Sequence, residues 1–129
     1  MGEVAHLIGN GKSSGFYSPA PGLKITCNLP PFPVEDAYAT CMVDFKMMNA
    51  IHKGNITVPG DWVLGARPHK WMEMKNDFYM KYSTQIKKFY LVLPSYCPNY
   101  TDFNCGHMAT HWIAIKLKRS EIHMYGFDS

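Results

Sequence analysis

Two residues near the carboxyl end of the printed sequence have side chains that could act together in catalysis. His111 begins a stretch in which apolar and polar side chains alternate, and Asp128 follows the next such stretch. The alternation over 111–118 and 121–127 is typical of half-buried strands, and the two-residue gap between them predicts a β-hairpin. In that hairpin His111 lies opposite Asp128, with their Cβ atoms roughly 4.5–5.5 Å apart. The pair is then either an imidazole oriented by a carboxylate, as in a catalytic triad, or a polar pair at a sheet edge.

The elements that must position this pair are expected to form an α+β fold. Residues 88–94 are an apolar run closed by a proline, which favours a buried strand. Apolar side chains at spacings of three and four predict a helix over 35–52, and a similar pattern indicates a second helix over 71–86. We therefore expect a small, mostly antiparallel sheet, made by 88–94 and the two hairpin strands, packed against these helices.

The amino-terminal residues 1–33 hold much of the glycine and proline and are interpreted as a loop-rich arm, ahead of one domain over 34–129. Gly11-Lys12-Ser13 has the order found at the end of a phosphate-binding loop. That motif also needs a glycine five residues before Gly11, where this chain has His6. The segment is therefore predicted to be a loop and not a nucleotide site.

Composition narrows the class of protein further. The chain has 129 residues, which suits one domain, and 47% hydrophobic residues, which favours a folded protein. A net charge of +3 does not call for a nucleic-acid partner, and no apolar run is long enough to span a membrane. With no secretory signal apparent, we expect a cytoplasmic or nuclear protein whose four cysteines are thiols.

Three segments carry a resemblance to a known family. They are 90–94 (YLVLP), 111–115 (HWIAI) and 122–129 (IHMYGFDS). Their order resembles the papain-like cysteine proteases of the clan that includes the SUMO proteases and the adenovirus endopeptidase. Residues 62–71 (WVLGARPHKW) also look like a segment of the plant, often transposon-derived, members. The resemblance covers about residues 60–129, and the hairpin is its specific part.

The resemblance implies a function for three residues. His111 corresponds to the general base of these proteases, and Asp128 corresponds to the carboxylate that orients it. Trp112 corresponds to the tryptophan that helps clamp the Gly-Gly end of the substrate. The alternative is that Trp112 packs on Phe127 as ordinary core. The resemblance also implies a partial papain-like fold and a ubiquitin-like modifier as partner. It implies no cofactor and a nuclear or cytoplasmic location.

The family's nucleophilic cysteine and its oxyanion-hole glutamine both follow the aspartate in sequence. All four cysteines of this chain precede His111, and the sequence stops at Ser129. Because the attacking group in such chemistry is a thiolate, we expect the amino-terminal portion of a protease that is inactive by itself.

Two alternatives stay open beside the protease. The first is a zinc-binding module whose ligands would be Cys97, Cys105, His107 and His111, although eight positions separate the two cysteines, more than in common zinc motifs. The second is a non-catalytic domain that binds a ubiquitin-like modifier on the surface of a protease scaffold.

Overall fold

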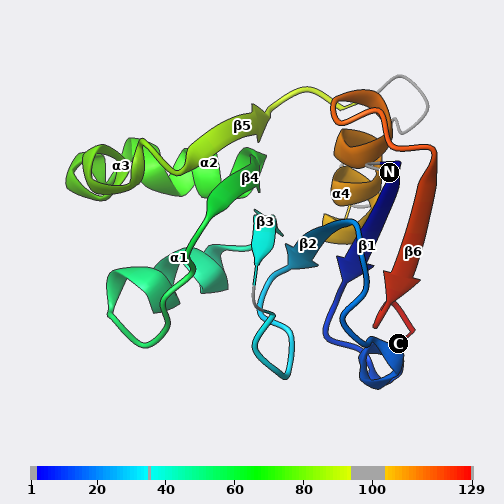
Figure 1. Cartoon of the computed structure of the whole chain (residues 1–129). Helices are drawn as coiled ribbons and strands as arrows, with labels where there is room; N and C mark the ends of the chain where they lie inside the picture. The colour runs from blue at the N-terminus through cyan, green and yellow to red at the C-terminus, as the bar shows by residue number, and fades with distance from the viewer. Residues whose placement is uncertain (1–2, 35, 94–103, 129) are drawn as a thin grey trace.

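Strands that are far apart in the sequence form one sheet in the computed structural model, which describes residues 3–34, 36–93 and 104–128. The strands are β1 Val4–Ile8, β2 Leu23–Cys27, β3 Ala37–Met42, β4 Asp61–Gly65, β5 Ile86–Tyr90 and β6 Glu121–Tyr125. The helices are α1 Phe45–His52, α2 Ala66–Glu73, α3 Asn76–Tyr82 and α4 Cys105–Ile115, and a 3₁₀ turn, η1, covers Lys12–Phe16. Figure 1 shows α1 to α3 gathered beside β3 to β5, and α4 set apart beside β1 and β2.

The six strands lie in the order β5-β4-β3-β2-β1-β6, and every neighbouring pair is parallel. This is an α/β fold of the Rossmann or flavodoxin type. The chain steps in one direction from β1 to β5 and then crosses back to add β6 on the other side of β1. Because crossovers between parallel strands are right-handed, a reversal of direction places the returning helix on the opposite face of the sheet.

Two hydrophobic clusters reflect this reversal. On one face, here called the α4 face, Met108, Trp112 and Ile113 of α4 pack on side chains of β1 to β4 such as Leu7 and Ile25. The cluster on the opposite face joins α1, α2 and α3 to β3 and β4 through Met42, Met48, Ile51, Trp62, Leu64, Met72 and Phe78. Within the described residues, no helix is long and apolar enough to cross a membrane.

The predicted antiparallel hairpin is wrong, and with it the α+β, papain-like fold. Of its two strands, 111–118 lies largely in helix α4, and 121–127 contains β6, which pairs in parallel with β1. The alternation over 111–118 misled because the helical pattern begins earlier in the chain. Cys105, Met108, Ala109, Trp112 and Ile113 form one buried helical stripe. Asn104 begins α4 with a capping box that it shares with His107.

The predicted helix over 35–52 divides into a strand and a helix. Residues 37–42 form β3, and only Phe45–His52 is helical. A strand buried on both faces is apolar throughout, so its sequence lacks the alternation that marks a half-buried strand. The helix expected over 71–86 is two shorter helices and the start of β5, whereas the strand expected over 88–94 overlaps the end of β5.

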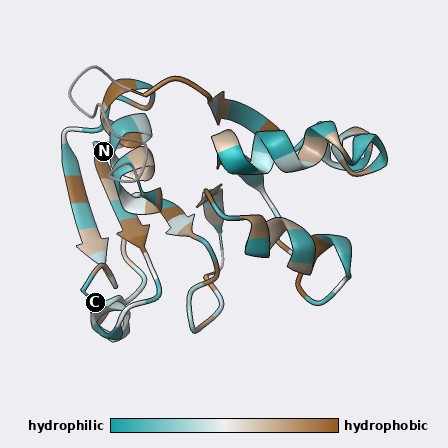
Figure 2. Cartoon of the chain, turned by 180° about the vertical axis from the view of Figure 1, so that it is seen from behind, coloured by the Kyte–Doolittle hydropathy of each residue, from teal (hydrophilic) through white to brown (hydrophobic). Residues whose placement is uncertain are grey.

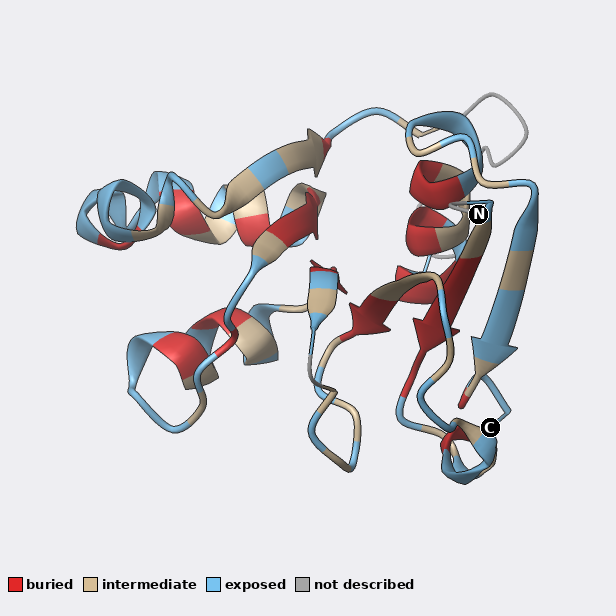
Figure 3. Ribbon diagram, in the orientation of Figure 1, coloured by how far each residue is buried: buried red, intermediate tan, exposed pale blue. Residues whose placement is uncertain are grey.

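Residues 1–33 are not an arm without a core, since β1 and β2 lie inside them and next to each other near the middle of the sheet. Ala5, Leu7, Ile8 and Ile25 are fully buried. Figure 3 shows this burial along β1, in contrast to the largely exposed edge strand β6. Figure 2 shows hydrophilic and hydrophobic residues alternating along β6, which is the pattern that predicted a strand there.

Candidate functional site

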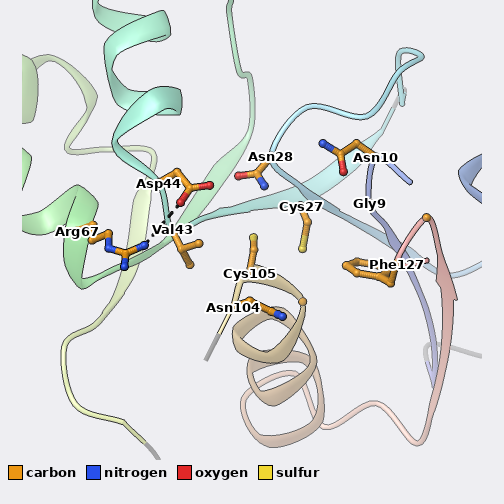
Figure 4. A pocket seen from close by; sticks show the side chains of 12 residues that line it. Gly9, Asn10, Cys27, Asn28, Val43, Asp44, Arg67, Asn104, Cys105 and Phe127 are labelled. Carbon is orange, nitrogen blue, oxygen red and sulfur yellow. Dashed lines mark ion pairs between the residues drawn. The ribbon is translucent and has the colours of Figure 1, made fainter. Parts of the chain in front are cut away.

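A pocket of about 360 Å³ lies at the carboxyl edge of the sheet (Figure 4). Its walls come from the segments that follow β1, β2, β3 and β6, and from the first turns of α2 and α4. Each parallel strand ends at this edge, so residues distant in sequence meet there. The pocket spans the point between β1 and β6 where the strand order reverses, which is where open α/β sheets bind their ligands.

Backbone hydrogen bonds hold the ends of β1 and β6 together at one side of the pocket. The N–H of Gly9 donates to the carbonyl of Tyr125 at 2.7 Å, and the N–H of Gly11 donates to that of Gly126 at 2.8 Å. A Cβ atom at Gly11 would lie 2.4 Å from the carbonyl oxygen of Asp128, so a larger residue cannot take its place without displacing this corner. The glycines of the β1 loop therefore permit a close approach of two backbones.

Ser13 joins the same corner through its side chain. Its Oγ and its backbone N–H both donate to Oδ1 of Asp128, at 2.5 and 2.9 Å, and the Oγ accepts from the N–H of Gly126 at 2.8 Å. The hydrogen bonds from Ser13 hold the pKa of Asp128 below its ordinary value, because they stabilise the charged carboxylate. Hydrogen bonds thus tie the Asp128 carboxylate to Ser13, in the loop that follows β1.

Three asparagines supply amide groups to the pocket, one each from the segments after β1 and β2 and one from the start of α4. They are Asn10, Asn28 and Asn104. Asn28 has a φ of 57°, a left-handed conformation that asparagine tolerates better than most residues. Its Oδ1 is buried and has no hydrogen-bond partner among the described residues. A buried amide oxygen without a partner is costly, so this atom is suited to accept a hydrogen bond from a ligand.

The amino terminus of α4 forms another wall, through Asn104, Cys105 and Gly106. Oδ1 of Asn104 accepts from the N–H of His107 at 3.0 Å, which fixes where the helix begins. The amino end of an α-helix carries partial positive charge and N–H groups without helical partners, so it favours anions. The pocket wall is therefore suited to a phosphate or a carboxylate.

Two buried thiols, Cys27 and Cys105, line the pocket and lie near the centre of Figure 4. Sγ of Cys105 donates to the carbonyl of Cys41 at 3.0 Å. Its hydrogen bond with Cys27, together with burial, raises the pKa of Cys105 well above the ordinary value. The raised pKa favours the protonated thiol of Cys105 at neutral pH, and the thiol is less reactive and binds metals less well than the thiolate.

One ion pair lines the far side of the pocket from Phe127 (Figure 4). Nη1 of Arg67 lies 3.8 Å from Oδ1 of Asp44, and both side chains are about half exposed. Arg67 lies in the first turn of α2 and Asp44 directly precedes α1. Charged, amide and aromatic groups thus follow one another along the carboxyl edge.

The residues expected to be catalytic are placed by separate elements, and no hairpin pairs them. His111 lies in the second turn of α4, where its ring meets the ring of Tyr90 edge-on, with centroids 5.8 Å apart. Asp128 is bonded to Ser13 as described above. Trp112, expected to clamp a substrate, is 6% exposed in the core of the α4 face and stacks on Tyr38.

The four residues of the zinc alternative are not gathered by the described part of the fold. Cys97 lies outside the described residues. Cys105 turns toward Cys41, whereas His107 takes part in the capping box of α4. His107 and His111 do line one pocket between α4 and β6. Within residues 3–34, 36–93 and 104–128, no group of three metal-ligating side chains is close enough to hold an ion.

Most of the pocket was missed from the sequence, although one signal pointed to it. The buried strand β1 runs directly into the glycine-rich loop GNGKSSG, and a strand followed by such a loop is common at phosphate sites. The loop lacks the glycine spacing of the phosphate-loop motif, and residues 4–8 were predicted to belong to a loop-rich arm and not to a strand. No protein-family model, curated protein or solved structure matches this chain.

Proposed function

We propose that this chain binds a small phosphate-bearing ligand of nucleotide type in the carboxyl-edge pocket. The observation that carries the proposal is the position of the pocket, where the β1 loop, the end of β6 and the amino terminus of α4 meet. Open parallel sheets bind ligands at such a reversal, and the helix that begins there holds the phosphate.

The lining favours a nucleotide over a bare anion. A pocket of about 360 Å³ has room for more than inorganic phosphate and lies within the range of ordinary ligand sites. Asn10 and Asn28 offer amide donors and acceptors to sugar hydroxyls or to the edge of a base. Phe127 presents an aromatic ring at the β6 side, suited to stack against a base.

Each part of the site then has one task. The first turn of α4 holds the phosphate, Asn28 accepts a hydrogen bond through its unpartnered Oδ1, and Phe127 limits the pocket on the β6 side. Binding is what these groups support, and the proposal assigns no catalytic residue. The peptidase activity and the ubiquitin-like partner stay predictions from the resemblance, and the parallel sheet removes the cross-strand geometry on which they depended.

Calorimetric titration of the purified chain tests the proposal. The probes are AMP, GMP, CMP and UMP, the four corresponding nucleosides and inorganic phosphate. We expect at least one nucleotide to bind at least tenfold more tightly than its nucleoside and than phosphate alone. Binding of nucleosides as tight as nucleotides, or no binding of any nucleotide at millimolar concentration, would contradict the proposal.

An Asn28→Asp variant ties the binding to this pocket. Aspartate keeps the size of the side chain and tolerates the left-handed backbone, and it adds a negative charge beside the ligand. We expect at least a tenfold loss of nucleotide affinity. Asn55→Asp is the matched control, because Asn55 is exposed beyond the end of α1 and gives the same change in net charge. Equal affinity in the two variants would place the ligand elsewhere.

A further inference from the structure

The Asp44 carboxylate is placed for a task other than helix capping. Asp44 is the residue before α1, a position where an aspartate commonly accepts a hydrogen bond from the first turn. Its backbone has the extended conformation of a cap (φ −107°, ψ 148°), yet its side chain makes no capping hydrogen bond. Instead the carboxylate pairs with Arg67 across the pocket wall.

Arg67 is also in an unusual electrostatic position. It lies in the first turn of α2, where the helix carries partial positive charge, so its own helix disfavours a cation there. The amino ends of α1, α2 and α4 all contribute residues to this pocket. Among the described residues that line it, Arg67 is the cationic side chain and Asp44 the anionic one.

The pair can be separated cheaply. Nη1 and Oδ1 are 3.8 Å apart, at the long end of an ion pair, and both side chains are about half exposed. An exposed pair of this kind contributes little to stability, so an incoming anion can take the place of the Asp44 carboxylate beside the Arg67 guanidinium. Phosphate and carboxylate groups both offer a planar guanidinium two oxygen acceptors. A phosphomonoester, however, carries a higher negative charge than a carboxylate.

We infer that Asp44 is a displaceable counter-ion and that Arg67 turns from it to the phosphate of the bound ligand, which makes this pair the charge selector of the site. The inference rests on the proposed function and adds the ligand class to it. A terminal phosphomonoester, with a charge of about −1.5 to −2 at pH 7, displaces Asp44. A phosphodiester or a carboxylate, with a single charge, competes with Asp44 on even terms and binds more weakly.

The experiment is a double-mutant cycle measured by calorimetry at pH 7.5. The wild type, Asp44→Asn, Arg67→Gln and the variant with both changes are titrated with AMP, GMP, CMP and UMP and with the methyl phosphodiester of each nucleotide. We expect Asp44→Asn to bind monophosphates about threefold to tenfold more tightly, since the competing carboxylate is gone. Arg67→Gln should bind them at least tenfold more weakly, and adding Asp44→Asn to it should restore less than twofold.

The methyl phosphodiesters supply the second readout. In the wild type they should bind at least fivefold more weakly than the monophosphates, and Asp44→Asn should narrow that ratio. Asp77→Asn is the control for the change in charge, because Asp77 is exposed at the start of α3 and lies outside the lining of the pocket. Thermal unfolding of each variant establishes that all are folded at the temperature of titration.

The outcomes separate the two proposals. Nucleotide binding by the wild type, with affinity unchanged or lowered in Asp44→Asn, overturns the counter-ion inference alone. An equal gain from Asp44→Asn with and without Arg67 also overturns it, since that result indicates plain repulsion and not exchange of partners. No binding by any of the variants overturns the proposed function and this inference together.

Discussion

Two regions of this sheet, the part around β3 to β5 and the junction of β1 with β6, are built in different ways. Beside β3 to β5, the helices α1 to α3 cover one face with large side chains. Trp62 is fully buried there, and its ring centroid lies 4.9 Å from that of Tyr82. At the meeting of β1 and β6 the chain uses glycines, short backbone hydrogen bonds and the Ser13 hydroxyl. The first region is held by burial and the second by close approach of polar backbone. The pocket lies at the second region, where small residues leave space and polar groups line it.

The largest effect expected from this contrast is at Trp62. Trp62→Ala removes a fully buried ring from the cluster between α1–α3 and the sheet, and should lower the free energy of unfolding by about 3–5 kcal/mol. Urea denaturation followed by circular dichroism measures it. The carbonyl of Val58, which accepts from the Trp62 indole, keeps a second donor in Gln85, so the loss reports packing.

Met74→Ala is the control for Trp62→Ala, because Met74 is 84% exposed, and it should change stability by less than about 0.5 kcal/mol. A loss below about 1 kcal/mol for Trp62→Ala would show that this side of the sheet does not depend on burial.

A smaller effect is expected at the polar corner. Gly126 has a φ of 80°, and a Cβ added there would lie 2.7 Å from the carbonyl oxygen of Gly9. Gly126→Ala therefore combines the strain of a left-handed residue with a backbone clash, and we expect a loss of about 2–4 kcal/mol in the unfolding free energy.

The matched control is Gly54→Ala. Gly54 has a φ of 79° but no atom within 4 Å of an added Cβ, so it should lose only the strain, about 1–2 kcal/mol. Equal losses at Gly54 and Gly126 would mean that the approach of β1 to β6 is not tight. Guanidinium unfolding curves of the two variants, recorded under one set of conditions, give the difference.

The smallest effect should depend on pH. Ser13→Ala removes the hydroxyl that donates to Asp128 and accepts from Gly126, and should cost about 1 kcal/mol at neutral pH. Because the folded state lowers the pKa of Asp128, the contribution of this carboxylate is present above its unfolded pKa. That contribution is lost as the pH falls through the folded value, so the gap between wild type and Ser13→Ala should narrow below about pH 4.

Urea midpoints of both proteins from pH 7 to pH 3 measure this gap. Ser83→Ala serves as the control, because the hydroxyl of Ser83 donates to a backbone carbonyl, that of Met80, and not to a carboxylate. A gap that stays constant to pH 3 in the Ser13→Ala series would remove Asp128 from the account of this corner.

Local patterns in the sequence identified some elements and misassigned others for physical reasons. Alternation located the strand at 121–125, and apolar spacing located the helical residues 45–52. The same patterns failed for β3, which is buried on both faces. They also failed for α4, because the predicted strand began at residue 111 and left out the first half of the helical stripe, which begins at Cys105. A short apolar run does not distinguish a buried strand from a buried helix.

The candidate site was harder to predict than its elements. In the sequence, Asn10, Asn28 and Arg67 belong to no recognisable motif, and nothing in their spacing links them. They meet because parallel strands all end at one edge of the sheet. His111 and Asp128 were linked only by an expected hairpin, and the fold assigns them to α4 and to the segment after β6.

The sequence by itself determined that apolar residues suffice for one folded domain, that a glycine-rich loop follows Ile8, and that 121–125 can be a strand. The tertiary structure alone decided that β6 pairs in parallel with β1, and that a pocket opens where they meet α4. The physical reason is that side-chain periodicity records which face of an element is buried, but not which distant strand lies beside it. Hydrogen bonds between parallel strands form between backbone groups common to nearly every residue, so the partner of a strand is chosen by the packing of the whole sheet.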